Sequence, residues 1–345
     1  MTMLAGVSAM GVDKEGYYTL RDILGYNCKV NIVLSDRGRG KSYGTKLFLM
    51  KQEGQFMCLY RNVSDVDSAV GTWLDTLYEN GYQPEQFEWE CGKGCYQLLY
   101  NGAVKGYFRA LSQVNHIKQE KFPDTLNWIW MDEFIPLVYK KLAGVNSEGD
   151  AIRAIMKTVE HDTAHSREEK GLRPLRVLMY ANPFTWNNPI LSYFKVRPFG
   201  YGIKRIGPDI VCEMLAPYEK EKKDNKMTMD EFLGDEVNRN QGWTEENSFV
   251  VDKWKDMVPE GSIRIRNVYY GIYHKESNRR LYVKEIDEHM GVGYCYGSLD
   301  GLQEKELCLD KVPFYKRLQQ MSYSGNVWYY DINTKFDWLR DIESL

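Results

Sequence analysis

A glycine-rich turn between an apolar strand and a helix constrains this chain more than any other feature. The run Val-Asn-Ile-Val-Leu at 30–34 predicts a buried strand, and the apolar spacing through Leu47, Phe48 and Met50 predicts a helix. A turn with two glycines that ends in Lys-Ser is typical of a phosphate-binding loop in this position. We expect this loop to consist of Ser35, Asp36, Arg37, Gly38, Arg39, Gly40, Lys41 and Ser42.

The residue types in the loop suit the binding of a nucleotide. Gly38 and Gly40 let the backbone turn its N–H groups inward, where they and the positive end of the following helix hold phosphates. Lys41 is expected to reach the β- and γ-phosphates of ATP, and the Ser42 hydroxyl to hold Mg²⁺. Ser35 stands where the usual motif has its first glycine, so a glycine-rich surface turn is the alternative.

A second motif points to hydrolysis. The apolar run 126–131 predicts a strand that ends at Asp132-Glu133. In a phosphate-loop enzyme the first carboxylate orders Mg²⁺, and the second acts as general base on the attacking water. A solvated loop is the usual explanation of an isolated Asp-Glu pair. The position of this pair, after a phosphate loop and one intervening strand, favours the catalytic interpretation for Asp132 and Glu133.

A third strand, predicted over 175–181, ends immediately before Asn182. In ATPases that insert a strand between the loop strand and the acidic strand, a polar residue at its tip senses the γ-phosphate. Asn182 fits this role, and a turn formed by Asn182-Pro183 is the equally weighted alternative.

The order of the predicted elements indicates two domains. Strands alternate with helices in residues 1–208, which predicts an α/β phosphate-loop ATPase domain with a mainly parallel sheet, and strand 209–215 is a candidate to complete it. Residues 216–250 are highly charged and predict a linker with helical character. Alternating strands then predict a smaller α+β domain over 251–345.

The composition limits the possible partners. A net charge of −3 argues against a basic coat for nucleic acid, although a few loops inside a channel need no such excess. No apolar run approaches the roughly 18 residues that span a bilayer, so we expect no membrane partner and a cytoplasmic location.

Taken together, the motifs resemble the large-terminase class of DNA-packaging ATPases of tailed phages, and most closely the short packaging ATPases of phi-29-like phages. The resemblance is carried by Arg37 within Arg-Gly-Arg-Gly-Lys-Ser, by Tyr60-Arg61, by Lys118 before the acidic strand and by Tyr180-Ala181-Asn182. It covers the first 215 residues, and it adds Arg37 to the catalytic candidates Glu133 and Asn182.

The resemblance implies a homo-oligomeric, pentameric ring in the host cytoplasm. Such a ring docks on the portal of a procapsid and pulls double-stranded DNA inward, in some cases with a structural RNA. A basic residue of one subunit is then expected to reach the γ-phosphate of its neighbour. Arg167 is the first candidate, followed by Arg173 and Arg176, and an exposed salt-bridging arginine is the alternative for each.

Two lysines are candidates for contact with DNA. Lys118 and Lys121 fall on a predicted loop before the acidic strand. Lysine grips phosphates without regard to base sequence and in a salt-dependent way, which suits a motor that moves any DNA. The alternative is a pair of solvated lysines, which is favoured for Lys121.

In large terminases the C-terminal domain is an RNase H-like nuclease, which needs a carboxylate on its first strand to hold metal ions. The candidate first strand here, 267–274, has none, so we expect an RNase H-like fold without nuclease activity. Two other interpretations stay open: another phosphate-loop enzyme, such as a helicase or a regulatory ATPase, and a terminase that still cuts DNA.

Overall fold

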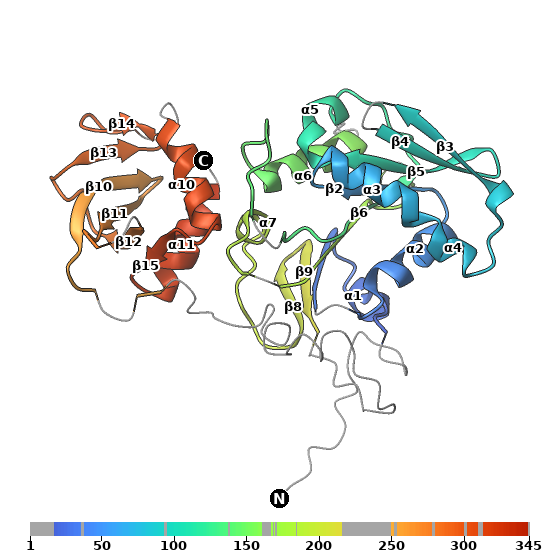
Figure 1. The fold of residues 1–345 in the computed structure, drawn as a ribbon, viewed down its shortest axis with the longest axis horizontal. Coiled ribbons are helices and arrows are strands. Elements are labelled where there is room, and N and C mark those ends of the chain that lie inside the picture. The colour runs from blue at the N-terminus through green and yellow to red at the C-terminus, as the bar shows by residue number, and fades with distance from the viewer. Residues whose placement is uncertain are drawn as a thin grey trace, which may run out of the picture.

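Two sheet-based units make up the computed structural model of the chain (Figure 1). The structure describes residues 17–35, 38–92, 95–136, 139–160, 167, 169, 171–183, 185–215, 250–251, 254–277, 280–299, 302–309 and 313–343. Asp36, Arg37 and the predicted charged linker over 216–249 therefore lie outside the described residues.

The first unit is built on a sheet with the strand order β3-β4-β5-β2-β6-β7-β1-β9-β8. The pairs from β5 through β9 are parallel, whereas β3, β4 and β8 pair antiparallel with their neighbours. β9 pairs with β1, so this sheet extends to Met214. The strands are β1 (Val30–Leu34), β2 (Gln55–Tyr60), β3 (Phe87–Gly92), β4 (Cys95–Tyr100), β5 (Ala103–Ala110), β6 (Leu126–Met131), β7 (Arg176–Ala181), β8 (Gly202–Gly207) and β9 (Ile210–Met214).

Helices cover both faces of this sheet, so its central strands are apolar on both sides. On β1, Ile32 packs into the core that includes Ile152 of α6, and its neighbour Val33 packs into the core that includes Leu49 of α2. One face carries α1 (Arg21–Gly25), α2 (Lys41–Lys51), α3 (Val63–Trp73) and α4 (Asp75–Tyr78); the other carries α5 (Val114–Ile117), α6 (Glu148–Glu160) and α7 (Pro189–Tyr193). In the described part of the chain, no helix is long and apolar enough to cross a membrane.

The second unit is a sheet with the order β14-β13-β10-β11-β12-β15. β10, β11 and β12 form an antiparallel meander, and β13 runs parallel to β10, as expected for an RNase H-like fold. The strands are β10 (Val258–Ile265), β11 (Val268–His274), β12 (Leu281–Ile286), β13 (Tyr294–Gly297), β14 (Leu307–Cys308) and β15 (Val327–Tyr329), and the helices are α10 (Pro313–Tyr323) and α11 (Ile332–Glu343).

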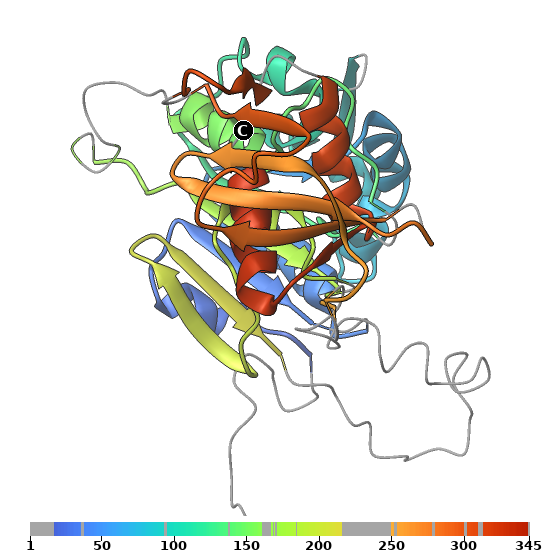
Figure 2. The same ribbon diagram turned by 90° about the vertical axis from the view of Figure 1, so that its left-hand side faces the viewer.

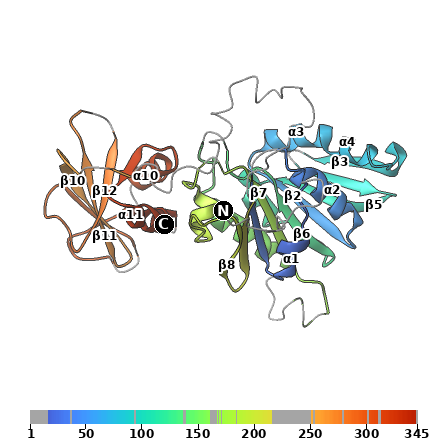
Figure 3. The same cartoon turned by 90° about the horizontal axis from the view of Figure 1, so that it is seen from below.

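Both helices of the second unit lie on the side of its sheet that faces the first unit (Figure 3). The opposite side carries no helix among the described residues, and its strands face the viewer in Figure 2. The prediction that 267–274 is the first strand of this unit was wrong, because β10 precedes it. Pro259 and Gly261 obscured β10 in the sequence, and the pairing of β10 with β11 shifts register between them.

The two units are joined by polar contacts that involve α10 and α11. Ser147, at the start of α6, donates to the Glu343 carboxylate at 2.7 Å, and Arg197 pairs with Asp337 at 2.8 Å. Glu343 is 2% exposed, and burial, reinforced by nearby Glu148, raises its pKa to about 8. A neutral carboxyl at this interface therefore avoids placing a second buried negative charge beside Glu148.

Candidate functional site

The predicted nucleotide residues meet because of the strand order. β7 lies between β1 and β6, all three are parallel, and their carboxyl ends therefore share one edge of the sheet. The phosphate loop follows β1, Asn182 follows β7, and Asp132 follows β6. β7 is therefore the strand inserted between the loop strand β1 and the acidic strand β6, as the prediction for Asn182 required.

The phosphate loop ends at the first turn of α2. Gly38 and Gly40 have φ angles of 79° and 68°, values that favour glycine, and Gly40 is the N-cap of α2. The Lys41 ammonium donates to the Ser35 hydroxyl at 2.6 Å, to the Ser35 carbonyl at 3.1 Å and to the Asn182 side-chain oxygen at 3.4 Å. These contacts hold the lysine at the edge where phosphates are expected.

Ser42 and Asp132 come together at the same edge. The Ser42 hydroxyl donates to the Asp132 carboxylate. Burial raises the pKa of Asp132, and the hydrogen bond from Ser42 opposes that shift. A hydroxyl and a carboxylate are the hard oxygen ligands that Mg²⁺ prefers alongside nucleotide phosphates, so the donor set fits this ion.

Glu133 has an unusual backbone conformation. Its φ angle is 50°, in the left-handed region that non-glycine residues rarely adopt. Its amide donates to the Asp132 carboxylate at 3.1 Å, and the next amide, of Phe134, donates to the Tyr180 carbonyl at 3.1 Å. The chain is thereby fixed on both sides of Glu133, whose side chain stays exposed. A fixed, accessible carboxylate is suited to accept a proton from water.

These side chains line one cavity. It holds about 150 Å³ between the loop and the ends of β6 and β7. The lining residues are Gly38, Arg39, Gly40, Lys41, Ser42, Tyr43, Asp132, Glu133, Ala181 and Asn182. Asp36 and Arg37 are outside the described residues, so their predicted roles stay predictions.

The structure corrects the expectation for Arg167. Arg167 is 7% exposed, and its guanidinium donates to the Arg173 carbonyl at 2.8 Å and to the Asn127 side chain at 2.7 Å. Asn127 belongs to the amino end of β6, whereas the cavity lies at the carboxyl end. A buried guanidinium that holds its own loop is poorly placed to reach a neighbouring subunit.

The two other candidate arginines, Arg173 and Arg176, also lie near the amino edge of the sheet. Arg176, in the first position of β7, bonds to the Asn27 side chain and lies over the Trp128 ring at 5.8 Å. Arg173 pairs with Glu53, and its side chain is 56% exposed. Of the three candidates, Arg173 is the most accessible to another subunit.

The predicted DNA-contacting lysines are both exposed. Lys118 and Lys121 lie between α5 and β6, on either side of Glu120, whose carboxylate pairs with Arg109 at 2.7 Å. Neither lysine lines the nucleotide cavity. Their exposure is compatible with contact to DNA and equally with solvation.

Sequence reasoning missed a group of residues beside the loop. Tyr18 donates from its amide to the Arg39 carbonyl at 2.7 Å and from its hydroxyl to Glu213 at 2.9 Å. A Cβ atom on Gly40 would lie 2.9 Å from the Tyr17 ring, so glycine is required there for a second reason. The sequence feature that could have indicated this group is Glu213, a carboxylate within the otherwise apolar strand 210–215.

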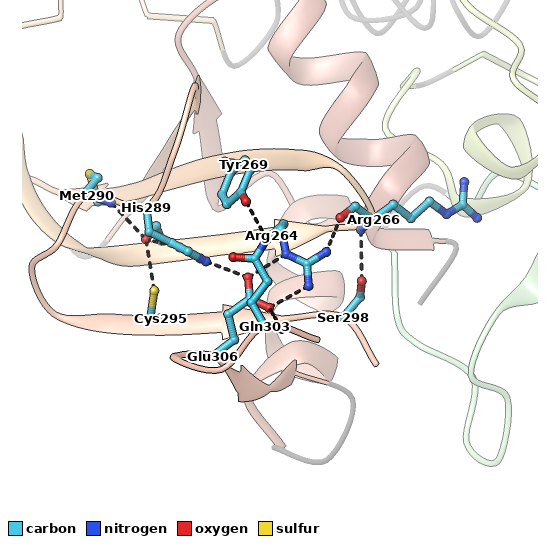
Figure 4. Close-up of polar contacts among 10 residues, drawn as sticks. Arg264, Arg266, Tyr269, His289, Met290, Cys295, Ser298, Gln303 and Glu306 are labelled. Atoms are coloured by element: carbon cyan, nitrogen blue, oxygen red, sulfur yellow. Dashed lines mark hydrogen bonds and ion pairs between the residues drawn. The ribbon is translucent and has the colours of Figure 1, made fainter. Parts of the chain in front are cut away.

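The second unit holds a different charged cluster, on the face of its sheet without helices (Figure 4). Arg264 of β10 donates to both carboxylate oxygens of Glu306, each at 2.6 Å, and His289 contacts the same carboxylate at 2.7 Å. The Arg264 and Glu306 side chains are 3% and 0% exposed. Burial alone would raise the pKa of Glu306, but these bonds and the Gln303 amide outweigh it and lower the pKa to about 2.

This cluster bears on the nuclease question. β10 carries one carboxylate, Glu260, which lies at the register shift and contacts His274 at 3.0 Å. The next two positions of β10 on this face hold Ser262, whose hydroxyl lies 2.7 Å from His289, and Arg264. Among the described residues, no group of three or more His, Cys, Asp or Glu side chains could hold a metal ion.

Comparison with solved structures identifies the fold. The structure titled "The Phi-28 gp11 DNA packaging Motor" matches with a TM-score of 0.64 at 16% identity, over 95% of this chain and 98% of that chain. "The bacteriophage Phi-29 viral genome packaging motor assembly" matches with a TM-score of 0.57 at 20% identity, over 95% and 99%. At these identities the likeness establishes the fold.

Comparison of the sequence with protein families identifies the relationship. No curated protein matches the chain. The family described as Podovirus DNA encapsidation protein (Gp16) matches residues 12–292, which is most of its length. The chain is therefore a member of the Podovirus DNA encapsidation protein (Gp16) family of phage DNA-packaging ATPase motors.

Proposed function

We propose that this protein hydrolyses ATP to drive double-stranded DNA into a viral procapsid. The observation that carries the proposal is the convergence of Lys41, Ser42, Asp132 and Glu133 on one cavity at the carboxyl edge of a parallel sheet. That edge is where open α/β sheets bind their ligands. Family membership supplies DNA packaging as the purpose of the chemistry.

Each side chain has a distinct part in the proposed reaction. Lys41 exchanges its contact with Ser35 for the β- and γ-phosphates and offsets their negative charge. Ser42 and Asp132 would hold Mg²⁺, which supplies further charge compensation when bound. Glu133 accepts the proton of the attacking water, and Asn182, next to Lys41, reports whether the γ-phosphate is present.

The oligomeric part of the proposal is a ring, pentameric by resemblance, docked on the portal in the host cytoplasm. The titles of the phi-28 and phi-29 structures describe packaging motors, and they support this assembly for the present chain. In such a ring Arg173, which is exposed, is the better candidate for the arginine that acts on the neighbouring site.

Lys118 and Lys121 are proposed to contact DNA phosphates, and a structural RNA is proposed as a further partner.

Subunit mixing tests the trans-acting arginine. Rings of Arg173→Ala alone and of Lys41→Ala alone should both be inactive. A mixture should recover part of the ATPase activity, because some interfaces then pair an intact Arg173 with an intact Lys41. Wild-type hydrolysis by Arg173→Ala alone would show that the arginine lies elsewhere.

We further propose that the second unit does not cut DNA. The support is Arg264, which lies on β10 in a buried pair with Glu306, where an RNase H-type nuclease needs a metal-binding carboxylate. The test is prolonged incubation of supercoiled plasmid with the protein and Mg²⁺ or Mn²⁺. The plasmid should stay intact; nicks that disappear on chelation of the metal would overturn this part of the proposal.

DNA packaging is tested with purified procapsids. The protein, ATP and linear DNA should yield DNA that resists an added nuclease, and Lys41→Ala should yield none. Protection without ATP, or normal protection by Lys41→Ala, would contradict the proposed role of the cavity.

A further inference from the structure

A buried tyrosine–carboxylate pair lies behind the phosphate loop. Glu213, on β9, is 0% exposed, and its Oε2 atom accepts a hydrogen bond from the Tyr18 hydroxyl at 2.9 Å. Tyr18 is 5% exposed and stands 195 residues earlier in the chain. The contact therefore fastens the segment before α1 to the strand next to β1.

Tyr18 connects this pair to the loop itself. Its amide donates to the carbonyl of Arg39, a loop residue, at 2.7 Å. Its ring meets the Tyr180 ring edge to face, with centroids 6.0 Å apart, and the Tyr180 hydroxyl lies 2.7 Å from the hydroxyl of Thr45 on α2. Contacts with Tyr18 and Tyr180 thus hold both Arg39, in the loop, and Thr45, on the helix that follows it.

Burying the carboxyl group of this pair costs more free energy than burying an apolar side chain in the same place. Burial raises the pKa of Glu213 to about 7, and the hydrogen bond from Tyr18 opposes that shift. Its Oε1 atom is buried and accepts no hydrogen bond within the described part of the chain. An apolar side chain would fill the site without this desolvation penalty, but it would not fix the direction of the Tyr18 ring and backbone.

We propose that Tyr18 and Glu213 are positioning residues that hold the phosphate loop in the conformation that binds nucleotide. The inference rests on the proposed ATP hydrolysis and adds two residues that touch no substrate. A loop released from this pair spends less of its time in the binding conformation, and apparent affinity falls in proportion to that fraction. Turnover of the bound nucleotide should change little, because Glu133 and Asp132 are anchored on β6 and β7.

The test is the Tyr18→Phe variant, which removes one hydroxyl and keeps the ring. We expect the KM for ATP to rise about three- to tenfold, in line with the loss of one hydrogen bond to a carboxyl group, with kcat within about twofold of wild type. The Glu213→Gln variant keeps an acceptor oxygen and should have a KM near the wild-type value. Tyr270→Phe is the matched control, because the Tyr270 hydroxyl donates to Asp341 at 2.7 Å in the second unit. It should lower Tm without changing KM.

A double variant separates positioning from stability. Tyr18→Phe with Glu213→Leu removes both polar groups, so no unpaired carboxyl remains and folding is preserved even if Tyr18→Phe alone is unstable. A raised KM in the double variant supports the proposal. A wild-type KM in a folded Tyr18→Phe or double variant overturns it. Wild-type protein that binds and hydrolyses no ATP would instead refute the proposed function, so the two failures are distinguishable.

Discussion

Charged side chains lie both at the cavity edge of the first sheet and on the helix-free face of the second sheet, but their surroundings differ. At the cavity, Lys41 rests on the neutral oxygens of Ser35 and Asn182, and Asp132 accepts from Ser42. On the second sheet, Arg264 and Glu306 satisfy each other. Charges that line a cavity remain accessible to a ligand, whereas a charge pair buried on a sheet face serves the fold.

Of the charged residues at the cavity, Glu133 is expected to give the largest effect when it is changed. Glu133→Gln keeps the size of the side chain but cannot accept a proton, so ATP turnover should fall about a hundredfold to ten-thousandfold. Binding of ATP should persist, because Lys41 and the loop are unchanged. Steady-state hydrolysis and equilibrium binding measure the two effects. Near-normal hydrolysis by the variant would show that another group is the base.

The second sheet should respond in stability instead of in catalysis. Arg264→Ala leaves Glu306 buried without its guanidinium partner, which should destabilise the second unit by about 3–5 kcal/mol. Arg264→Met with Glu306→Leu should recover most of that loss, since neither charge remains. Denaturant unfolding measures both variants. If Arg264→Ala were as stable as wild type, the Arg264–Glu306 pair would not be needed for the stability of the second unit.

The interface between the units should depend on pH. The folded-state pKa of Glu343, about 8, lies above its unfolded value, so its contribution to stability is full at acidic pH and is lost as pH rises through about 8. Thermal melts between pH 6 and pH 9 should show a falling Tm in wild type and a flatter profile in Glu343→Gln. An equal decline in both proteins would assign the effect to other groups, of which Glu213 is the first to examine.

The smallest effect is expected at the exposed pair across the same interface. Arg197 and Asp337 are 2.8 Å apart, but the Arg197 side chain is 47% exposed. Arg197→Ala should therefore change the free energy of unfolding by less than about 1 kcal/mol, and by still less at high salt. A larger loss would mean that this pair, rather than Glu343, dominates the interface.

The nucleotide edge could be predicted from the sequence because each of its parts follows a strand directly. The loop, Asp132 and Asn182 each come after a short apolar run, and parallel strands bring such ends together. β6 was found at its predicted bounds, 126–131. The parallel pairing of β5 with β2 needed the structure, because it joins residues that are far apart in the sequence, such as Phe56 and Gly106.

The remaining features depend on contacts between distant residues or on broken patterns. β8 is a polar edge strand, Gly-Ile-Lys-Arg-Ile-Gly, with no apolar run to mark it. The helical segment after β2 divides at Leu74 into α3 and α4. The burial of Arg167 depends on Asn127, 40 residues away, and the Tyr18–Glu213 pair spans 195 residues. Local periodicity contains no information about either contact.

The central claim is that the cavity hydrolyses ATP in order to move DNA, and one measurement tests it most directly. ATP hydrolysis by the purified protein should be followed with and without double-stranded DNA of unrelated sequences, at low and at moderate salt. We predict strong stimulation by every DNA, weakening as salt rises, because contacts to DNA phosphates do not depend on base sequence and are sensitive to salt. Robust hydrolysis that is indifferent to DNA would contradict the translocase and indicate a regulatory ATPase on the same fold.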